Sequence, residues 1–406
     1  MREGKRRVLL VSSQPIQTAA TLRLMASHAE VGTLTAYCSL AEARLWRDDE
    51  HLNKDAFDTP ALDGYDWTQL SNWSPRPSLG KFYGLVNPGV VRLALRSDCV
   101  VVFGHNYVSF WLAICAAKLA GKPLILTTDA TRLSSSGGSG WKTRLKRRVL
   151  PFLYNRVADM VLVPSTAGRR FVCSLGVRGE RVALTPYVVD NEAIALTAAR
   201  SDRTRTRAEL GVPPDAPVAV FCAKFIARKR PHDALRAFAQ AGVPASHLVM
   251  VGDGPLMESL KEEAARLNIA DRVRFTGLVK YSRLPEVYAA SDLLVFTSEE
   301  EPYGLPVNEA MVCGLPVVAS DQIGAAHDLV CEGETGFTYP CGDVDKLAAT
   351  LRELLPDGER LRKMGAAARA RMTTWSPREN AETTLKAVEK VIAAKGGRLQ
   401  AQEVRE

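Results

Sequence analysis

The sequence predicts an α/β protein of two domains, each built on a doubly wound parallel sheet, and three observations lead to this expectation. The chain has 406 residues, which is more than one hydrophobic core usually supports. Short β-branched runs alternate with helical patterns, as is typical of parallel strands joined by crossover helices. These runs fall into two sets. The expected place for chemistry is a cleft between the carboxyl ends of two sheets that face each other.

Nine apolar runs predict the strands. The first set reads RRVLLVSS (6–13), DCVVVFG (98–104), KPLILTT (122–128) and DMVLVPS (159–165). The second set reads APVAVFCA (216–223), SHLVMVG (246–252), RVRFTG (272–277), DLLVFTS (292–298) and LPVVAS (315–320). The polar stretch around residues 187–216 is interpreted as the interdomain connection. The expected domains are therefore 1–190 and 191–376, with a final helix over 377–395 that folds back on the first domain.

Composition excludes several classes of protein. Hydrophobic residues make up 46% of the chain and charged residues 24%, as in globular proteins. No stretch approaches the roughly 18 consecutive apolar residues of a membrane-spanning helix. The apolar run after the basic start MREGKRR is too short for a signal peptide. The eight cysteines show neither CxxC nor zinc-ligand spacing, so we expect reduced, buried thiols in a cytoplasmic protein.

The positive charge is concentrated in the first half of the chain. Residues 1–190 hold 25 Lys and Arg against 15 Asp and Glu, whereas residues 191–406 hold 28 against 30. Much of the excess lies in WKTRLKRRVLPFLYNRV (141–157), a basic amphipathic helix. Two interpretations stay open: contact with an anionic membrane surface, which would place the protein at the inner face of the cell membrane, and a solvated helix on the core. A nucleic-acid partner ranks last, because no nucleic-acid motif accompanies the charge.

The region between Cys38 and Pro88 breaks the alternation of strands and helices. It is polar and aromatic, and Gly and Pro interrupt it. We interpret it as a long insertion near the cleft. Its aromatic side chains are expected to cover the core, ahead of the alternative that they stack on sugars.

The most informative segment is 291–330. Glu301 follows the run DLLVFTS, and Pro306 suits the first turn of a helix that continues through Glu309 to Cys313. A carboxylate such as that of Glu309, flanked by apolar residues, is costly to bury unless it is hydrogen-bonded, and the two vicinal hydroxyls of a ribose would supply matched donors. The alternative is a helix-stabilising Glu on a solvated face.

This segment resembles the family 4 glycosyltransferases, which have the GT-B fold of two Rossmann-like domains. Glu301 and Glu309 match the family's Glu-x7-Glu motif, Tyr303 and Gly304 take its aromatic-Gly position, and GLPVVAS follows. The resemblance implies that the C-terminal domain binds a nucleoside-diphosphate sugar. Glu301 would contact the donor sugar and Glu309 the ribose. The helix start, formed by Tyr303, Gly304, Leu305 and Pro306, would face the diphosphate with its N–H groups.

Two cations follow the strand APVAVFCA. Lys224 and Lys229 match positions where family members usually carry an Arg and a Lys. With Glu301 they are the expected catalytic residues, because fixed cations would neutralise the leaving nucleoside diphosphate without a metal. The single DxD, at Asp343 to Asp345, is interpreted as the acidic start of a helix. We therefore expect no metal and no cofactor.

Two further segments of the C-terminal half are candidates for donor binding. Gly252 and Gly254 lie at a strand-to-helix turn, where missing side chains would let a nucleobase or phosphate approach the backbone. A tight turn needed for packing explains them nearly as well. The backbone around Leu278 and Val279 matches the family's base-binding region.

The N-terminal half matches the family less closely. SSQPIQTAA stands in place of a glycine-rich loop, so Gln17 and Thr18 take that position. Family members often carry a His-Asp pair after the third strand of the first set, but here Thr precedes Asp129. His105, at the end of the second run, is an alternative sugar contact and equally a structural residue.

The resemblance thus implies a retaining glycosyltransferase. It would act in cell-envelope or exopolysaccharide synthesis, on a glycan, lipid-linked or small-molecule acceptor. Two alternatives stay open: a GT-B-fold nucleotide-sugar epimerase or hydrolase, and a non-catalytic nucleotide-sugar-binding protein.

Overall fold

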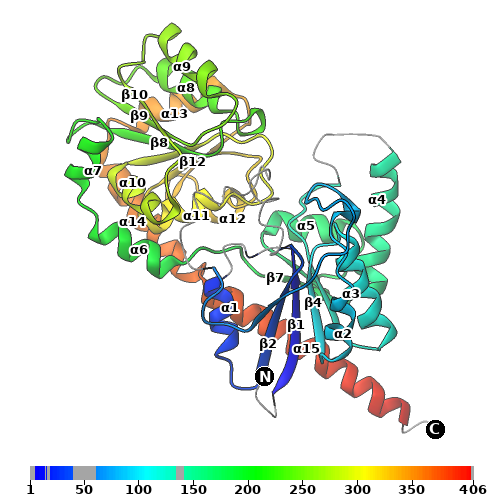
Figure 1. Ribbon diagram of the computed structural model, residues 1–406. Helices are drawn as coiled ribbons and strands as arrows, with labels where there is room; N and C mark the ends of the chain where they lie inside the picture. The colour runs from blue at the N-terminus through cyan, green and yellow to red at the C-terminus, as the bar shows by residue number, and fades with distance from the viewer. Residues whose placement is uncertain (1–4, 14, 16–18, 40–60, 134–140, 404–406) are drawn as a thin grey trace. The chain divides into compact units, whose positions relative to one another are not determined.

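The computed structural model describes residues 5–13, 15, 19–39, 61–133 and 141–403, and these form two α/β units (Figure 1). The N-terminal unit contains the described residues up to Tyr187 together with those from Pro377 onward. The C-terminal unit is continuous from Val188 to Ser376. Each unit has its own parallel sheet. The predicted class of two doubly wound parallel-sheet domains is confirmed.

The N-terminal sheet has seven strands in the order β3-β2-β1-β4-β5-β6-β7. Their bounds are β1 (Arg6–Ser12), β2 (Val31–Tyr37), β3 (Trp67–Gln69), β4 (Cys99–Phe103), β5 (Leu124–Thr127), β6 (Met160–Val163) and β7 (Val182–Leu184). The strand order reverses between β1 and β4. The sequence patterns missed three of these strands. β3 and β7 are three-residue edge strands, and β2 alternates apolar residues with Gly and Thr, so none of them forms a continuous apolar run.

Helices cover both faces of this sheet, and successive strand residues point to opposite faces. Leu9 and Val11 belong to a core shared with α2 (Gly89–Leu95), α3 (Val108–Leu119), α4 (Trp141–Phe152) and α5 (Thr166–Ser174). Val8 and Leu10 pack instead with α1 (Ala19–Ala26) and α15 (Pro377–Glu403). The final helix therefore completes the core of the unit that contains the N-terminus.

The C-terminal sheet has six strands in the order β10-β9-β8-β11-β12-β13. They are β8 (Val218–Cys222), β9 (His247–Val251), β10 (Val273–Gly277), β11 (Leu293–Phe296), β12 (Val317–Ser320) and β13 (Gly336–Tyr339). The helices are α6 (Asn191–Arg200), α7 (Arg203–Glu209), α8 (Pro231–Ala241), α9 (Met257–Arg266), α10 (Leu284–Ala290), α11 (Leu305–Val312), α12 (Ala326–Leu329), α13 (Val344–Leu354) and α14 (Gly358–Arg371). The sequence patterns missed β13, a short edge strand.

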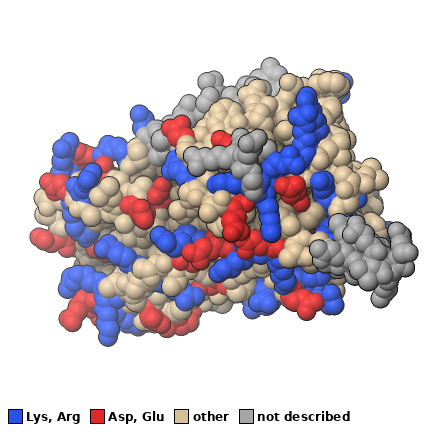
Figure 2. All heavy atoms as spheres, turned by 90° about the horizontal axis from the view of Figure 1, so that it is seen from below, with Lys and Arg blue, Asp and Glu red and all other residues tan. Residues whose placement is uncertain are grey.

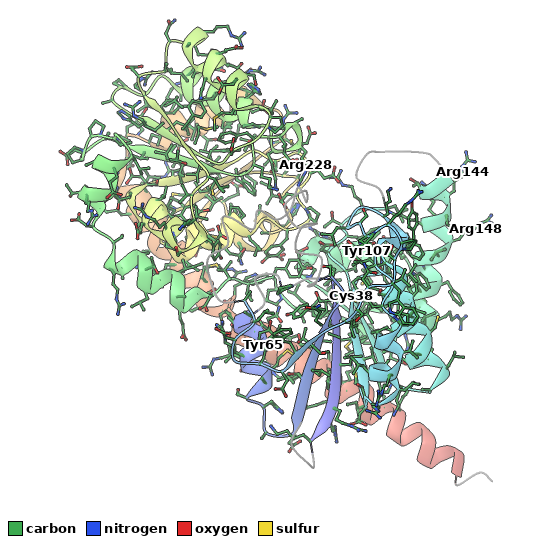
Figure 3. All side chains as sticks on the ribbon, in the orientation of Figure 1. Cys38, Tyr65, Tyr107, Arg144, Arg148 and Arg228 are labelled. Atoms are coloured by element: carbon green, nitrogen blue, oxygen red, sulfur yellow. The ribbon has the colours of Figure 1, made fainter. Side chains whose placement is uncertain are left out.

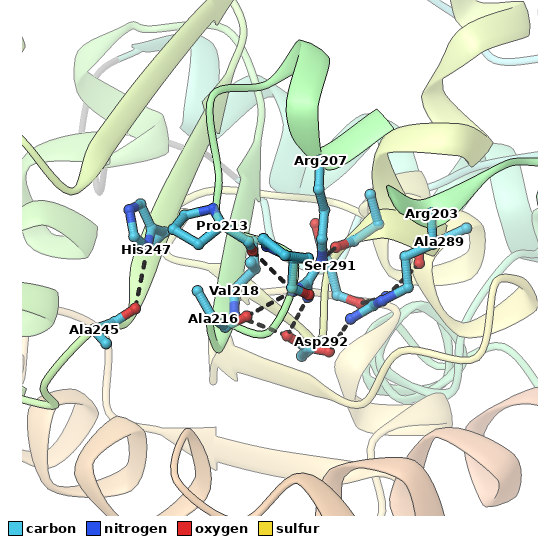
Figure 4. A network of polar contacts seen from close by, with 12 residues as sticks. Arg203, Arg207, Pro213, Ala216, Val218, Ala245, His247, Ala289, Ser291 and Asp292 are labelled. Carbon is cyan, nitrogen blue, oxygen red and sulfur yellow. Dashed lines mark hydrogen bonds and ion pairs between the residues drawn. The ribbon is translucent and has the colours of Figure 1, made fainter. Parts of the chain in front are cut away.

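The interpretation of residues 187–216 as an interdomain connection is too broad: the chain passes from one unit to the other between Tyr187 and Val188. The stretch folds into α6 and α7 of the C-terminal unit, where Arg207 is almost fully buried. Its guanidinium donates to Asp292 Oδ2 and to the Ala290 carbonyl, both at 2.9 Å, and Asp292 accepts the Val218 N–H at 2.8 Å (Figure 4). Asp292 thus ties α7 to the first residue of β8. This polar stretch is part of the folded unit because hydrogen bonds satisfy the buried guanidinium of Arg207.

Two other expectations need correction. All eight cysteines are unpaired, but of these Cys115 on α3 is exposed, because that position of the helix faces solvent. The aromatic residues between Cys38 and Pro88 cover the core only in part: Tyr65 packs against it, whereas Trp73, Phe82 and Tyr83 are exposed. They lie between β3 and α2, outside both hydrophobic clusters of the unit.

Candidate functional site

The C-terminal sheet reverses its winding between β8 and β11. β8 is hydrogen-bonded to β9 on one side and to β11 on the other. The segments that follow β8 and β11 therefore leave the same edge of the sheet and diverge. A doubly wound sheet offers a ligand crevice at such a switch point. The segments bordering it are residues 223–230 and 297–304.

Lys229 and Glu301 meet between these two segments. The Lys229 Nζ forms an ion pair with Glu301 Oε2, and the side chains are only 13% and 15% exposed. The ammonium also lies 5.4 Å from the centroid of the Phe296 ring. Lys224 and Arg228 are close enough for their charges to act on Lys229. The structure thus brings together the three residues predicted to be catalytic and adds Arg228.

The electrostatics of this cluster favour an anion. Burial, with added repulsion from Arg228 and Lys224, lowers the pKa of Lys229 to about 7. The Glu301 carboxylate acts in the opposite sense because it favours the ammonium form. One carboxylate therefore faces several cations, and a bound phosphate would add the negative charge that stabilises all of them.

The backbone that carries Lys229 is fixed by its neighbours. Arg230 has φ +48°, in the left-handed region, and its guanidinium donates to Asp233 at 2.6 Å and to Glu299 at 3.1 Å. The Thr297 hydroxyl donates to the carbonyls of Lys229 and Arg230, at 2.8 and 2.9 Å. The segment after β11 therefore holds the segment after β8 in place.

The segment that carries Glu301 is fixed from the other side, by the turn after β12. The Glu301 carbonyl accepts the Gly324 N–H at 3.0 Å, and the Tyr303 carbonyl accepts the Ala325 N–H at 2.7 Å. A Cβ on Gly324 would lie 2.0 Å from the Pro302 carbonyl oxygen, so only glycine permits this approach. Gly304 has φ +101° and caps α11.

At the start of α11 the residues face in different directions. Leu305 and Pro306 are half-buried. The Tyr303 side chain is buried, and its hydroxyl accepts a 2.6 Å hydrogen bond from the Trp375 indole N–H. The Tyr303 phenol is thus engaged inside the unit, and only its backbone belongs to the helix start.

Glu309 lies within α11, and its carboxylate is buried. It is 4% exposed and accepts a 3.0 Å hydrogen bond from the Tyr288 hydroxyl on α10. Burial raises its pKa to about 7, although hydrogen bonds from Tyr288 and Tyr281 oppose the shift. The sequence reasoning missed these two phenols. A polar partner had to exist for a carboxylate on an apolar helix, but the sequence does not show that α10 supplies it.

Gly252 and Gly254 are explained by packing within the protein. A Cβ on Gly252 would lie 2.0 Å from the Ala223 carbonyl oxygen, and one on Gly254 would lie 2.6 Å from that of Phe225. These glycines let the turn after β9 pack against the segment that carries Lys224. Leu278 is exposed and Val279 half-buried, directly after β10.

In the N-terminal unit, His105 and Asp129 follow the adjacent strands β4 and β5. Burial, with Lys146 nearby, lowers the pKa of His105 to about 4, and its ring meets that of Tyr154 edge to face at 6.2 Å. Burial raises the pKa of Tyr154 to about 12, to which the Asp129 charge also contributes. His105 is therefore a neutral imidazole near Asp129 at the carboxyl edge. Gln17 and Thr18 lie outside the described residues.

The described residues have neither a cluster of metal ligands nor a helix suited to crossing a membrane. They contain no group of three or more His, Cys, Asp or Glu placed to hold a metal ion. Asp343 caps α13 by accepting the Lys346 N–H at 2.8 Å, and Asp345 accepts from Gln240 at 2.7 Å. Among the helices described here, none is both long and apolar enough to cross a membrane.

Two family models match the chain, one in each unit. "Glycosyl transferases group 1" matches residues 202–371, and "Glycosyl transferase 4-like domain" matches residues 21–188. With the two doubly wound units, these matches define a glycosyltransferase of the GT-B class.

Similar proteins of known activity identify the family more specifically. A GDP-mannose-dependent alpha-(1-6)-phosphatidylinositol monomannoside mannosyltransferase from Mycolicibacterium smegmatis is 30% identical over 65% of this chain and 72% of its own length. Sulfoquinovosyl transferase SQD2 from Arabidopsis thaliana is 31% identical over 67% of this chain, which spans 51% of that relative's length. The chain belongs to the family 4 glycosyltransferases.

The fold has a close counterpart among solved structures. HepE from Anabaena in complex with UDP aligns with a TM-score of 0.72 over 95% of this chain and 100% of its own, at 23% identity. This similarity shows the fold.

Proposed function

We propose that this chain transfers a sugar from a nucleoside-diphosphate sugar, bound by the C-terminal unit, to an acceptor bound by the N-terminal unit. The observation that carries the proposal is the meeting of Lys224, Arg228 and Lys229 with Glu301 at the switch point. The cations suit a diphosphate, and the carboxylate suits the hydroxyls of the attached sugar. Family membership and the UDP and UDP-glucose bound to HepE support a nucleotide-sugar donor.

The proposed reaction retains the anomeric configuration and needs no metal. The bond between the anomeric carbon and the diphosphate oxygen breaks, the acceptor oxygen bonds to that carbon, and the acceptor's proton passes to the leaving diphosphate. Negative charge develops on the diphosphate as its bond breaks. Lys224 and Lys229 stabilise that charge from fixed positions, which is the contribution that a divalent cation would otherwise make. Glu309 holds the ribose once the donor hydroxyls replace the phenols around it.

The acceptor is proposed to be a cell-envelope or exopolysaccharide glycan, met at the inner face of the cell membrane. His105 and Asp129 are the proposed acceptor contacts. α4 supports a membrane contact, because Arg144, Leu145 and Lys146 on it are exposed. An anionic lipid surface attracts such a basic helix.

Thermal-shift titration with UDP, GDP and ADP tests the donor proposal. A nucleotide that binds only the folded state raises the melting temperature. We expect one of the three to do so, and Glu309→Gln, which keeps the shape but removes the carboxylate, to abolish the shift. Glu334→Ala, at an exposed position, is the matched control. If none of the three nucleotides shifts the parent protein, the donor proposal fails.

Product analysis with the matching nucleotide sugar distinguishes the remaining alternatives. Transfer predicts free nucleoside diphosphate together with a glycosylated acceptor of unchanged anomeric configuration, in the presence of EDTA. A free or isomerised sugar alone would indicate an epimerase or hydrolase. Binding without release of diphosphate would indicate a non-catalytic protein.

A further inference from the structure

One stretch of the N-terminal unit, residues 67–158, combines positive charge with exposed apolar side chains. Its sequence holds 13 Lys and Arg but only two acidic residues, Asp98 and Asp129. Of the 11 large hydrophobic side chains that are exposed among the described residues, eight lie in this stretch. They are Trp67, Trp73, Phe82, Tyr83, Leu95, Leu119, Leu145 and Phe152. Positive charge together with exposed apolar side chains is typical of protein surfaces that dock on an anionic lipid bilayer. Leu95 and Leu119 end the helices that lead into β4 and β5, at the amino edge of the sheet, so they do not belong to the face argued below.

The most exposed aromatic residues lie on the segment 70–88 between β3 and α2, here called the aromatic excursion. Trp73 is 72% exposed, Phe82 52% and Tyr83 48%. Because β3 runs parallel to its neighbours, the excursion leaves the sheet at its carboxyl edge. His105 and Asp129 follow strands that end at the same edge.

Hydrogen bonds hold the backbone of the aromatic excursion in place. Two hydrogen bonds join its two arms. The Trp73 N–H donates to the Val86 carbonyl at 2.7 Å, and the Ser74 hydroxyl donates to the Tyr83 carbonyl at 2.8 Å. The Tyr107 hydroxyl donates to the Leu79 carbonyl at 2.7 Å, which ties the excursion to the loop that carries His105.

Buried Asn87 fixes the base of the aromatic excursion. Its Nδ2 donates to the carbonyls of Cys38, Leu70 and Ser71 at 3.0–3.1 Å, and its Oδ1 accepts from the Ser109 hydroxyl at 2.7 Å. The exposed rings are thus presented on an ordered backbone, so little conformational entropy is lost when they are buried by a partner.

Cations accompany these rings. Arg76 and Lys81 of the excursion are exposed. α4 adds Arg144 and Lys146–Arg148, and the charge of Lys146 acts on His105, whose loop is tied to the excursion. In Figure 3 the side chains of Arg144 and Arg148 project outward from α4. On the face shown in Figure 2, Lys and Arg are interspersed with Asp and Glu.

We propose that the aromatic excursion and α4 form one docking face for an anionic lipid bilayer, in which the rings enter the interface and the cations face the headgroups. Trp and Tyr favour this depth, because their rings are apolar and carry one polar group. Each Lys or Arg near an anionic surface strengthens binding by roughly fivefold. The face brings the edge with His105 and Asp129 to the membrane. Given the proposed glycosyltransferase function, on which this last step rests, the acceptor is lipid-linked.

Co-sedimentation of the full chain with phosphatidylcholine vesicles, with and without phosphatidylglycerol, tests the docking face. We expect binding to vesicles that contain phosphatidylglycerol, and loss of that binding at high salt. The affinity of the double variant Trp73→Ser/Phe82→Ser for these vesicles should be lower by about tenfold or more. Leu196→Ser is the matched control, because Leu196 is 50% exposed on α6 of the other unit.

Tryptophan emission provides a second readout. Trp73 should move to shorter emission wavelength when phosphatidylglycerol vesicles are added, and this component should be absent in Trp73→Phe. Unchanged vesicle binding by the double variant would overturn the proposal. So would a Trp73 shift with soluble maltoheptaose but not with vesicles, since that assigns the rings to a glycan. The UDP thermal shift tests the donor site separately, so failure of either proposal is recognised without the other.

Discussion

Lys229 is held where burial opposes its charge, and Glu301 is the carboxylate that compensates for it. The ion pair between them occupies the place where a donor's diphosphate and sugar are proposed to bind. A donor would give Lys229 a phosphate partner, and Glu301 could then accept from sugar hydroxyls. The ion pair therefore holds both side chains in position before the donor binds, because each fixes the other.

Removing the Lys229 charge should mainly slow the transfer step. With Lys229→Met we expect kcat to fall by about 100-fold or more, as when one fixed group that stabilises developing charge is lost. Steady-state kinetics with the donor identified by thermal shift measure this. Lys346→Met, at an exposed position in α13, should leave kcat unchanged, and equal losses in both variants would contradict the role of Lys229.

The pH dependence of donor binding should report the same lysine. Because the pKa of Lys229 is about 7 in the free protein, the ammonium form that binds phosphate is lost as pH rises through that value. The affinity for the nucleotide identified by thermal shift should therefore fall between about pH 6.5 and 8.5. Isothermal titration calorimetry of Lys229→Met should give a flatter profile, and a parent profile that does not change with pH would contradict this.

Glu309 should make the unfolding free energy depend on pH. Its pKa is raised from 4.5 to about 7, so between these values the folded state binds more protons than the unfolded state. The unfolding free energy contributed by this group therefore decreases as pH rises from about 4.5 to 7. Urea unfolding at several pH values should show this decrease, and Glu309→Gln should remove it. A parent and variant that share one slope would contradict the assignment.

At the scale of elements, the turn before α11 is the most sensitive to substitution. A Cβ on Gly304 would lie 2.9–3.1 Å from Ile323, Phe296 and Glu301, and the residue has φ +101°. Gly304→Ala should lower the unfolding free energy by about 1–3 kcal/mol and weaken UDP binding, because Glu301 has to move.

Gly333→Ala is a matched control for that substitution. Gly333 also has positive φ, +74°, but a Cβ there meets nothing within 4 Å. Gly333→Ala therefore introduces backbone strain without steric crowding of the new Cβ. Urea unfolding and UDP titration of both variants separate the two effects, and similar losses in nucleotide binding would contradict the role of crowding at Gly304.

The sequence predicted most strands inside the sheets and missed most of those at the edges, with two exceptions: β10 is an edge strand that was predicted, and β2 is an inner strand that was missed. All nine apolar runs became strands, since central parallel strands are continuous apolar segments. The edge strands β3, β7 and β13 are too short and mixed to give that signal. In the site, Glu301, Lys224 and Lys229 were recognisable because they lie on the segments that follow β8 and β11 and match motif positions of the family. Tyr281 and Tyr288 were not, because packing of α10 on α11 brings them to Glu309.

At the scale of the whole molecule, each sheet has its own switch point, and each carries a set of polar residues at the carboxyl edge. In the C-terminal unit these are the cations and Glu301, and in the N-terminal unit His105 and Asp129. Docking on a membrane, as proposed, adds a third surface, which belongs entirely to the N-terminal unit. One chain thus combines separate surfaces that the proposals assign to donor, acceptor and lipid.

The return of α15 to the N-terminal unit makes the other unit an insertion in the chain. Residues 188–376 form one uninterrupted segment, and Asn380 Nδ2 donates to the Pro186 carbonyl at 2.5 Å, so the points of departure and return are adjacent. The segment 188–376 could therefore be excised as an independent folding module, whereas truncation at Ser376 would remove Ala381, Leu385 and Val388 from the core of the other unit. A C-terminal deletion should accordingly unfold the part of the molecule that contains the first residues of the chain.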